Sequence, residues 1–186
     1  MVRIGVIAGS TRPGRKADAV ARWVTDVAAK RGDVSAELVD IAGYDLPHFD
    51  EVMPPSMAPS RRPAVRRWAA TVAGFDGFVF VTPEYNHSIP GALKDAVDFL
   101  FEEWRNKSAG LVSYGVHGGT RAAEHLRLVL GQVGVADVRS QVALSLVTDF
   151  ANFRDFRPAP QHEQAVGTML DEVVAWAGAL RALRRA

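Results

Sequence analysis

The sequence predicts a single α/β domain in which five parallel strands form one doubly wound sheet with helices on both faces. Strand-like and helix-like segments alternate five times along the 186 residues, and no internal repeat or low-complexity linker divides them. A chain of this length can bury roughly 70% of its unfolded surface in one core. We therefore expect residues 1–186 to form one domain.

The predicted strands are short segments dominated by apolar and β-branched residues. The first, residues 2–8, is almost continuously apolar, as expected of a strand buried on both faces of a parallel sheet. The other four are predicted at residues 34–41, 75–81, 108–114 and 135–144.

The predicted helices show apolar residues at i, i+3, i+4 and i+7, the spacing of one helix face. Val20, Trp23, Val24 and Val27 form the first such stripe. Further helices are predicted at residues 63–73 and 161–183, and around the apolar stripes that run from residue 93 to 100 and from residue 122 to 133. Two segments lack periodicity: residues 42–62 are rich in proline and predict a surface loop, and residues 148–160 predict a lid or a partner surface.

The composition argues against several classes of protein. The 22 basic and 21 acidic residues give a net charge of +1, which provides no general attraction to nucleic acid. Cysteine is absent, so disulfides, thiolate metal sites and a cysteine nucleophile are excluded, and a cytoplasmic location is favoured. No apolar run approaches the ~20 residues that span a bilayer. The histidines lack metal-ligand spacing, and we expect no metal and no membrane partner.

The loop after the third strand has the most unusual sequence, Thr-Pro-Glu-Tyr-Asn-His-Ser-Ile-Pro-Gly-Ala-Leu-Lys over residues 82–94. Ligands of open α/β sheets bind outside the carboxyl ends of the strands, where this loop lies. Pro83 and Pro90 fix their own φ angles, and Gly91 lets a backbone come close. The loop therefore predicts a rigid, polar-edged wall for a flat ligand.

The loop after the first strand carries the marks of an anion site. Ser10, Thr11, Arg12 and Arg15 precede a helix, whose free N–H groups and dipole attract phosphate. The Rossmann fingerprint is excluded because residue 11 is not glycine, and the Walker A pattern fails because no hydroxyl residue follows Lys16. A turn with a solvated basic helix start is the alternative interpretation.

The loop after the fourth strand, Ser-Tyr-Gly-Val-His-Gly-Gly over residues 113–119, offers backbone N–H groups with little side-chain bulk. Such a loop can hydrogen-bond the edge of a heterocycle. Its Ser113 misses the Gly-x-Ser-x-Gly nucleophile elbow by one position, which weakens a hydrolase hypothesis. His117 could be a base or an ordinary surface residue.

Taken together, these three loops resemble the NAD(P)H-dependent FMN reductase family of flavodoxin-like proteins, which includes quinone, chromate and azo-dye reductases. The resemblance covers roughly residues 2–145. The loop after the third strand, residues 82–94, is its most specific motif and is called the third loop below. It implies that Ser10, Arg12 and Arg15 bind the FMN phosphate with Thr11 beside them. It also implies contacts to the isoalloxazine from Pro83, Glu84, Tyr85 and Asn86, largely through backbone groups, and to its other edge from Ser113, Tyr114 and Gly115. Many relatives carry a further Ser or Asn where this chain has Gly14, Arg15 and Lys16.

The function implied is that of an oxidoreductase that passes a hydride from NADPH or NADH through FMN to a small acceptor such as a quinone or free flavin. No catalytic side chain is required, because the cofactor performs the chemistry. A flavodoxin-like electron carrier is the alternative, although such carriers have strongly acidic surfaces and this chain does not. A phosphate-binding or hydrolytic domain without flavin is a third possibility. Relatives are commonly homodimers or homotetramers, and residues 150–156 are a candidate contact.

Overall fold

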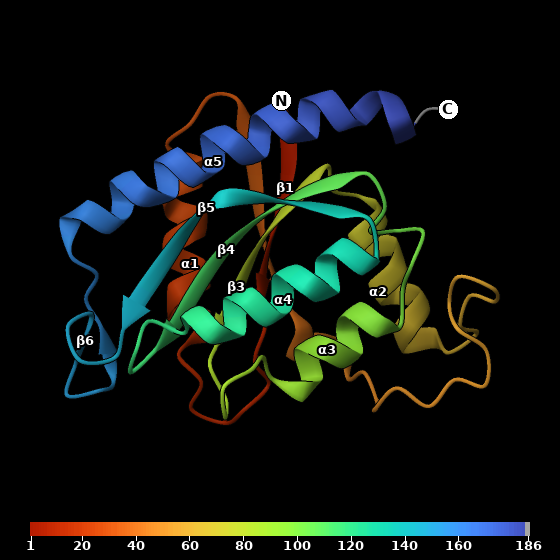
Figure 1. The fold of residues 1–186 in the computed structure, drawn as a ribbon, viewed down its shortest axis with the longest axis horizontal. Helices are drawn as coiled ribbons and strands as arrows, with labels where there is room; N and C mark the ends of the chain where they lie inside the picture. Colours follow the sequence, from red (N-terminus) through yellow and green to blue (C-terminus); the bar gives the residue numbers. More distant parts are fainter. Residues whose placement is uncertain (185–186) are drawn as a thin grey trace.

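The computed structural model describes residues 1–184 and confirms the α/β architecture (Figure 1). Five parallel strands form one sheet in the order β2-β1-β3-β4-β5. The strands are β1 Val2–Ala8, β2 Val34–Asp40, β3 Gly77–Pro83, β4 Lys107–Gly115 and β5 Val135–Ser145. The helices are α1 Ala17–Ala29, α2 Pro63–Ala73, α3 Gly91–Asp98, α4 Thr120–Gln132 and α5 Pro160–Leu180.

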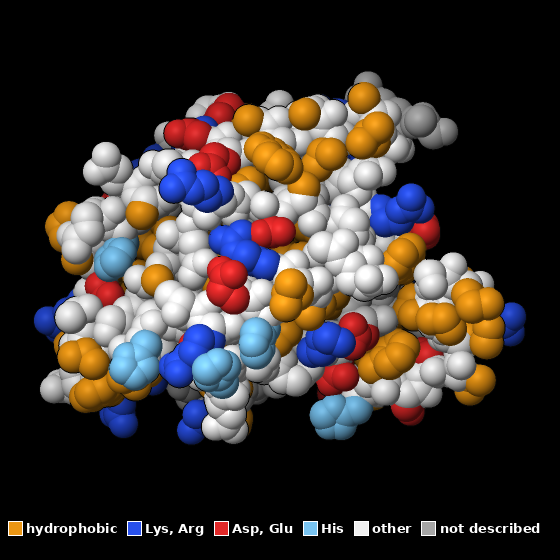
Figure 2. All heavy atoms as spheres, viewed as in Figure 1, with side chains coloured by type: hydrophobic (Ala, Val, Ile, Leu, Met, Phe, Trp, Pro, Cys, Tyr) orange, Lys and Arg blue, Asp and Glu red, His pale blue; other side chains and the backbone are white. Residues whose placement is uncertain are grey.

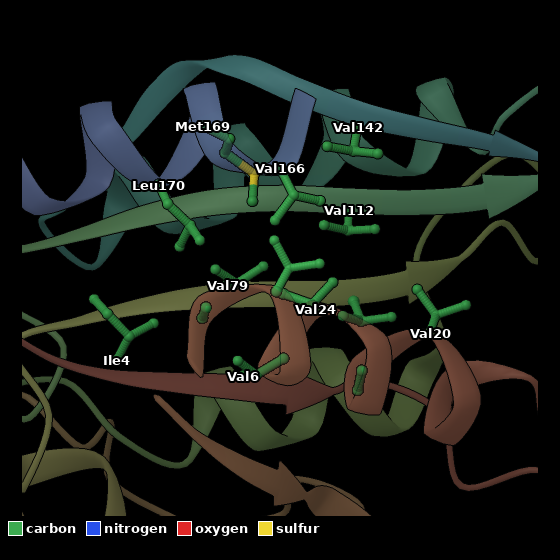
Figure 3. Packing of buried hydrophobic residues seen from close by; sticks show 14 of the residues in the cluster. Ile4, Val6, Val20, Val24, Val79, Val112, Val142, Val166, Met169 and Leu170 are labelled. Atoms are coloured by element: carbon green, nitrogen blue, oxygen red, sulfur yellow. The ribbon is translucent and has the colours of Figure 1, made fainter. Parts of the chain in front are cut away.

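The sheet separates two hydrophobic cores. On one face, α1 and α5 contribute Val24, Val166 and Leu170, which pack against β1, β3 and β4 (Figure 3). α5 can lie close to β4 because residue 110 is glycine: a Cβ there would stand 2.7 Å from the sulfur of Met169. Helices α1 and α5 therefore cover this face of the sheet, and a parallel sheet requires both of its faces to be covered.

The second core lies between the sheet and α2, α3 and α4 and is rich in aromatic rings. Trp68 of α2 and Trp104 pack edge to face with centroids 5.9 Å apart, and Phe78 of β3 stands 5.0 Å from Trp104. Both indole N–H groups donate to carbonyls of α3, from Trp68 to Ala96 at 2.7 Å and from Trp104 to Val97 at 3.1 Å. The buried rings thus satisfy their polar atoms while tying α2 to α3.

The predicted boundaries need four corrections, the first being that α3 ends at Asp98 and not at Leu100. The third strand begins at Gly77, because Asp76 turns into the sheet edge: its N–H donates to the carbonyl of Arg3 and its carboxylate accepts from the N–H of Arg3. Residues 41–44 form a short 3-10 helix, whose Ala42 N–H donates to the Asp40 carboxylate. The last α-helix ends at Leu180, and residues 181–184 continue as a 3-10 turn.

The predicted lid, residues 148–160, contains a small hairpin of β6 Phe150–Ala151 and β7 Asp155–Phe156. Phe150 is buried against Tyr114 and Phe156, with ring centroids 5.9 and 5.0 Å away. The buried Asp149 accepts from the N–H of Ser145 at 2.8 Å. This segment is therefore docked on the first core, and only Phe153 presents a large apolar surface to solvent.

Within the described residues, no helix is both long enough and apolar enough to cross a membrane.

Candidate functional site

The three loops singled out in the sequence converge at the carboxyl ends of β1, β3 and β4, which are neighbours in the sheet. The chain order reverses between β1 and β3, since β2 lies on one side of this pair and β4 on the other. Such a switch point is where open α/β sheets bind their ligands. In Figure 1 the three loops lie at the lower edge of the sheet. The predicted convergence is confirmed.

The first loop is tied to the third by a hydrogen bond between two hydroxyls. Ser10 is completely buried, and its Oγ lies 2.9 Å from the hydroxyl of Tyr85. Arg12 is exposed, with its guanidinium 6.0 Å from the centroid of the Tyr85 ring. Helix α1 then begins without any side-chain cap, so its first N–H groups remain available to an anion.

The guanidinium of Arg15 is already hydrogen-bonded and is not free to bind an anion at the start of α1. Its Nε donates to Asp18 and its Nη2 to Asp40, both at 2.6 Å. The Asp18 hydrogen bond, with the charges of Asp40 and Asp18, outweighs burial and raises the pKa of Arg15 above its already high ordinary value. The guanidinium therefore braces the start of α1 against the end of β2. Arg12, by contrast, pairs with no carboxylate among residues 1–184.

The third loop forms a tight two-residue turn. The N–H of Tyr85 donates to the carbonyl of Ser88 at 2.9 Å, and the N–H of Ser88 donates back at 3.2 Å. Asn86 and His87, between them, have φ angles of 50° and 75°. These are the signs expected of a type I′ turn, a conformation that asparagine accepts readily and histidine less readily. The turn therefore holds the exposed Asn86 in one orientation.

Glu84 follows the buried Pro83, and its side chain points toward α4. Its carboxylate lies 2.5 Å from Nη2 of Arg121 and accepts from the Arg121 N–H at 3.3 Å. The side chain of Glu84 is only 8% exposed. The Glu84 N–H donates to the carbonyl of Tyr114 at 3.0 Å, so the Glu84 carbonyl is the group that remains for a ligand. Sequence analysis missed Arg121, since nothing in its local pattern identifies its partner 37 residues away.

The fourth loop is held by its own side chains. The buried Ser113 donates through Oγ to the carbonyl of Gly118 at 2.7 Å and accepts from Gln141 at 3.2 Å. Gly119 has a φ of 68°, and a Cβ there would stand 2.8 Å from the backbone of Tyr114. The Ser113 hydroxyl thus shapes the loop from within. Gly115 lies at the loop itself and contributes no side chain.

Tyr114 departs from its expected place, because its side chain enters the first core. The residue is 4% exposed, and its hydroxyl is the one fully buried side-chain polar atom in the described chain without a hydrogen bond of good geometry, although the backbone of Ala17 lies near enough to oppose the rise of its pKa. Burial, followed by the proximity of Tyr85 and Asp18, raises the pKa of Tyr114 above its ordinary value. The phenol stays protonated and lies inside the fold.

Comparison with known proteins identifies relatives over most of the chain. Residues 2–149 match the family model described as NADPH-dependent FMN reductase. An NAD(P)H-dependent FMN reductase of Nectria sp is 38% identical over 159 residues, covering 80% of this chain and 79% of the relative. A quinone reductase of Escherichia coli is 36% identical over 136 residues and covers 69% of each chain.

Among solved structures, the flavoenzyme NAD(P)H:(acceptor) oxidoreductase FerB of Paracoccus denitrificans superposes with a TM-score of 0.75. The match covers 96% of this chain and 98% of that one at 22% identity, so it supports the fold alone.

Proposed function

This chain belongs to the NADPH-dependent FMN reductase family, and from that premise we propose how its own residues serve an FMN-dependent NAD(P)H oxidoreductase. The cofactor supplies the chemistry, because it takes a hydride from NAD(P)H and passes it to a small acceptor. The protein has to bind the flavin, orient it and leave room for its substrates. The observation that carries the proposal is the uncapped start of α1 directly beside the rigid Tyr85 turn.

The first loop fits a dianionic phosphate. Helix α1 offers N–H groups without a side-chain cap, and Arg12 offers a guanidinium without a carboxylate partner in residues 1–184. We assign phosphate binding to Ser10, Thr11 and Arg12, with Arg15 adding positive charge while it braces the loop. Ser10 also fixes the distance between the phosphate and ring subsites, through its bond to Tyr85.

The third and fourth loops fit a flat ring. Pro83, Glu84, Tyr85 and Asn86 provide one wall, and the turn geometry points to their backbone groups as the contacts. Gly115 leaves the other edge open to backbone hydrogen bonds. Ser113 supports this edge from beneath, and Tyr114 supports it by packing in the core. None of these residues has to move a proton for hydride transfer.

The acceptor we propose is a quinone or free flavin, because the Escherichia coli relative is named a quinone reductase and the family is named for FMN reduction. We further propose a cytoplasmic protein that assembles as a homodimer or homotetramer. The exposed Phe153, at the tip of the β6–β7 hairpin, is the candidate contact within residues 150–156.

A visible absorption spectrum tests the proposal. Purified protein is mixed with FMN, freed of unbound cofactor, and titrated anaerobically with NADPH and, separately, NADH. We expect a retained flavin spectrum that bleaches with at least one donor and recovers when a quinone is added. A protein that holds no FMN, or a bound flavin that neither donor bleaches, contradicts the proposal. Size-exclusion chromatography with light scattering tests the oligomeric state.

A further inference from the structure

Three polar side chains gather on the surface next to the third loop. His87 comes from the turn, and Arg121 and His125 lie one helical turn apart on α4. The two imidazole centroids are 5.9 Å apart, and Nη1 of Arg121 lies 3.4 Å from Nδ1 of His87. Figure 2 shows pale-blue histidine rings beside a blue side chain over the beginning of α4. Of the three, only Arg121 contacts the flavin site proposed above, through the carboxylate of Glu84.

The hydrogen bonds within this cluster direct donors outward. Arginine can only donate, so Nδ1 of His87 accepts and its ring proton resides on Nε2. Nδ1 of His125 is occupied by the hydroxyl of Ser88 at 3.0 Å, which leaves its Nε2 free as well. Both histidines are exposed. The cluster therefore presents imidazole and guanidinium nitrogens to solvent.

Glu84 matches the charge of Arg121, but the neighbouring carboxylates leave the outward N–H groups of the guanidinium open. Glu84 lies beneath Arg121, since its side chain is 8% exposed and that of Arg121 is 42% exposed. Glu124, on the next turn of α4, pairs with Arg127 at 3.2 Å. The outer rim of the guanidinium is thus left for an anion, and a guanidinium binds phosphate through paired N–H donors.

The turn holds His87 in a left-handed conformation, with φ at 75°. A residue other than glycine adopts this conformation at some cost, which the surrounding hydrogen bonds must offset. His87 is therefore presented rigidly, on the turn whose Tyr85 forms the proposed wall for the flavin ring. The FMN phosphate is accounted for by the first loop, on the far side of Tyr85.

We infer that His87, Arg121 and His125 bind the phosphate groups of the hydride donor, NAD(P)H. The inference rests on the proposed function, since a nicotinamide stacked on the flavin would carry its charged phosphates to the rim of the same site. The pyrophosphate is common to NADPH and NADH, whereas the 2′-phosphate belongs to NADPH alone. The cluster supplies affinity for the donor and takes no part in the hydride step.

Steady-state kinetics on the FMN-loaded protein tests the inference. The variants are His87→Asn with His125→Asn, because asparagine tolerates the left-handed φ, and Arg121→Lys, which keeps a cation beside Glu84. Arg105→Lys is the matched control for the arginine variant, since Arg105 is an exposed arginine that pairs with Glu102 at 3.1 Å at the other end of the sheet. The donors are NADPH, NADH and 1-benzyl-1,4-dihydronicotinamide, which has no phosphate. Equilibrium dialysis of adenosine 2′,5′-bisphosphate measures phosphate binding without turnover.

We expect a five- to tenfold rise in KM for NADPH in both the histidine pair and the arginine variant (about 1–1.4 kcal/mol at RT ≈ 0.59 kcal/mol), with kcat and FMN affinity unchanged in the histidine pair. The benzyl donor should react as with the wild type, and the bisphosphate should bind more weakly. A rise for NADPH alone places the 2′-phosphate at the cluster, and a rise for both nucleotides places the pyrophosphate there. Unchanged KM for both, or an equal rise for the benzyl donor, overturns the inference. Failure of the wild type to hold FMN would instead overturn the proposed function.

Discussion

Charged side chains crowd both ends of the sheet, and the two ends use them differently. At the amino ends of the strands, Asp76 accepts from Arg181 at 2.8 Å, from Arg184 at 2.6 Å and from the N–H of Arg3. Lys107 donates to the carbonyls of Val72 and Ala73, the last of α2, at 2.7 and 3.4 Å. The charge of Asp76 is thus matched by two guanidinium groups, and the ammonium of Lys107 is held by backbone carbonyls.

At the carboxyl ends the matching is incomplete. Arg15 is fully engaged, but Arg12 pairs with no carboxylate of the described chain, and His87 and His125 direct nitrogens to solvent. Helix α1 begins without a side-chain cap at the same edge. We infer from this contrast that paired charges in this fold serve stability and that the unpaired charge of Arg12 marks the proposed ligand site.

The largest effect should come from breaking the paired end. Asp76→Ala leaves Arg181 and Arg184 without their acceptor, and we expect the free energy of unfolding in urea to fall by about 2–3 kcal/mol. FMN affinity should not change. A variant as stable as the wild type would contradict the role given to this cluster.

The same cluster predicts a loss of stability in acid. Burial opposes ionisation of Asp76, but the N–H of Arg3 and the guanidinium groups of Arg181 and Arg184 outweigh it and hold the pKa of Asp76 below its ordinary value. The stabilisation is therefore complete above the ordinary pKa, about 4, and is lost as the pH falls below it. Asp76→Ala should flatten this part of the profile.

Lys107 should produce a smaller effect of the same sign, at higher pH. Burial, with the charge of Arg184, outweighs Asp76 and Glu103 and lowers the pKa of Lys107 from 10.5 to about 8. Between these values the unfolded chain binds a proton that the folded chain does not, so stability rises with pH, by on the order of 2 kcal/mol. The slope of unfolding free energy between pH 8 and 10.5 measures it. Lys107→Met should remove that slope, and a slope that persists would refute the assignment.

At the carboxyl ends of the strands, the expected change is in FMN affinity. Arg12→Ala should weaken FMN about tenfold, or about 1.4 kcal/mol, because a charge-assisted phosphate contact is lost. Arg15→Ala should weaken FMN too, but with a loss of stability, since Asp18 and Asp40 lose their partner. Riboflavin, which has no phosphate, serves as the control and should bind both variants like the wild type. Unchanged FMN affinity in both variants would refute the first-loop assignment.

The smallest expected effect is that of Tyr114→Phe on the free energy of unfolding. The buried hydroxyl of Tyr114 has no hydrogen bond of good geometry in the described chain, so its removal should raise the free energy of unfolding by about 1 kcal/mol. Tyr44→Phe is the matched control, because its hydroxyl donates to Thr71 at 2.9 Å and its loss should lower stability. A destabilised Tyr114→Phe would mean that the hydroxyl has a partner after all.

The sequence predicted the fold well because apolar periodicity is a local property. The stripe of Val20, Trp23, Val24 and Val27 defined α1, and the continuous apolar run of residues 2–8 defined β1. The convergence of three loops followed from the topology of a parallel sheet alone. Strand ends were less accurate, since the start of β3 depends on Asp76, whose partners lie at both ends of the chain.

The site was predicted at the level of its loops and only partly at the level of its side chains. Arg15 is separated from Arg12 by its bonds to Asp18, three residues on, and to Asp40, 25 residues away, and the second of these partners has no local signal. The inward direction of Tyr114 depends on Phe150, which sequence analysis had placed in a lid. Such pairings are set by tertiary packing, which local patterns do not record.

The aromatic core described above places the two buried tryptophans on one side of the sheet, so tryptophan fluorescence reports mainly on that side. Trp68 and Trp104, the two fully buried indoles, lie on the α2–α3–α4 side, whereas Trp23 is partly exposed and Trp176 is 49% exposed on the opposite face. Intrinsic emission should therefore follow mainly the loosening of one half of the domain, and circular dichroism should follow both. If the two transitions separate, the sheet acts as a partition between halves that melt in sequence.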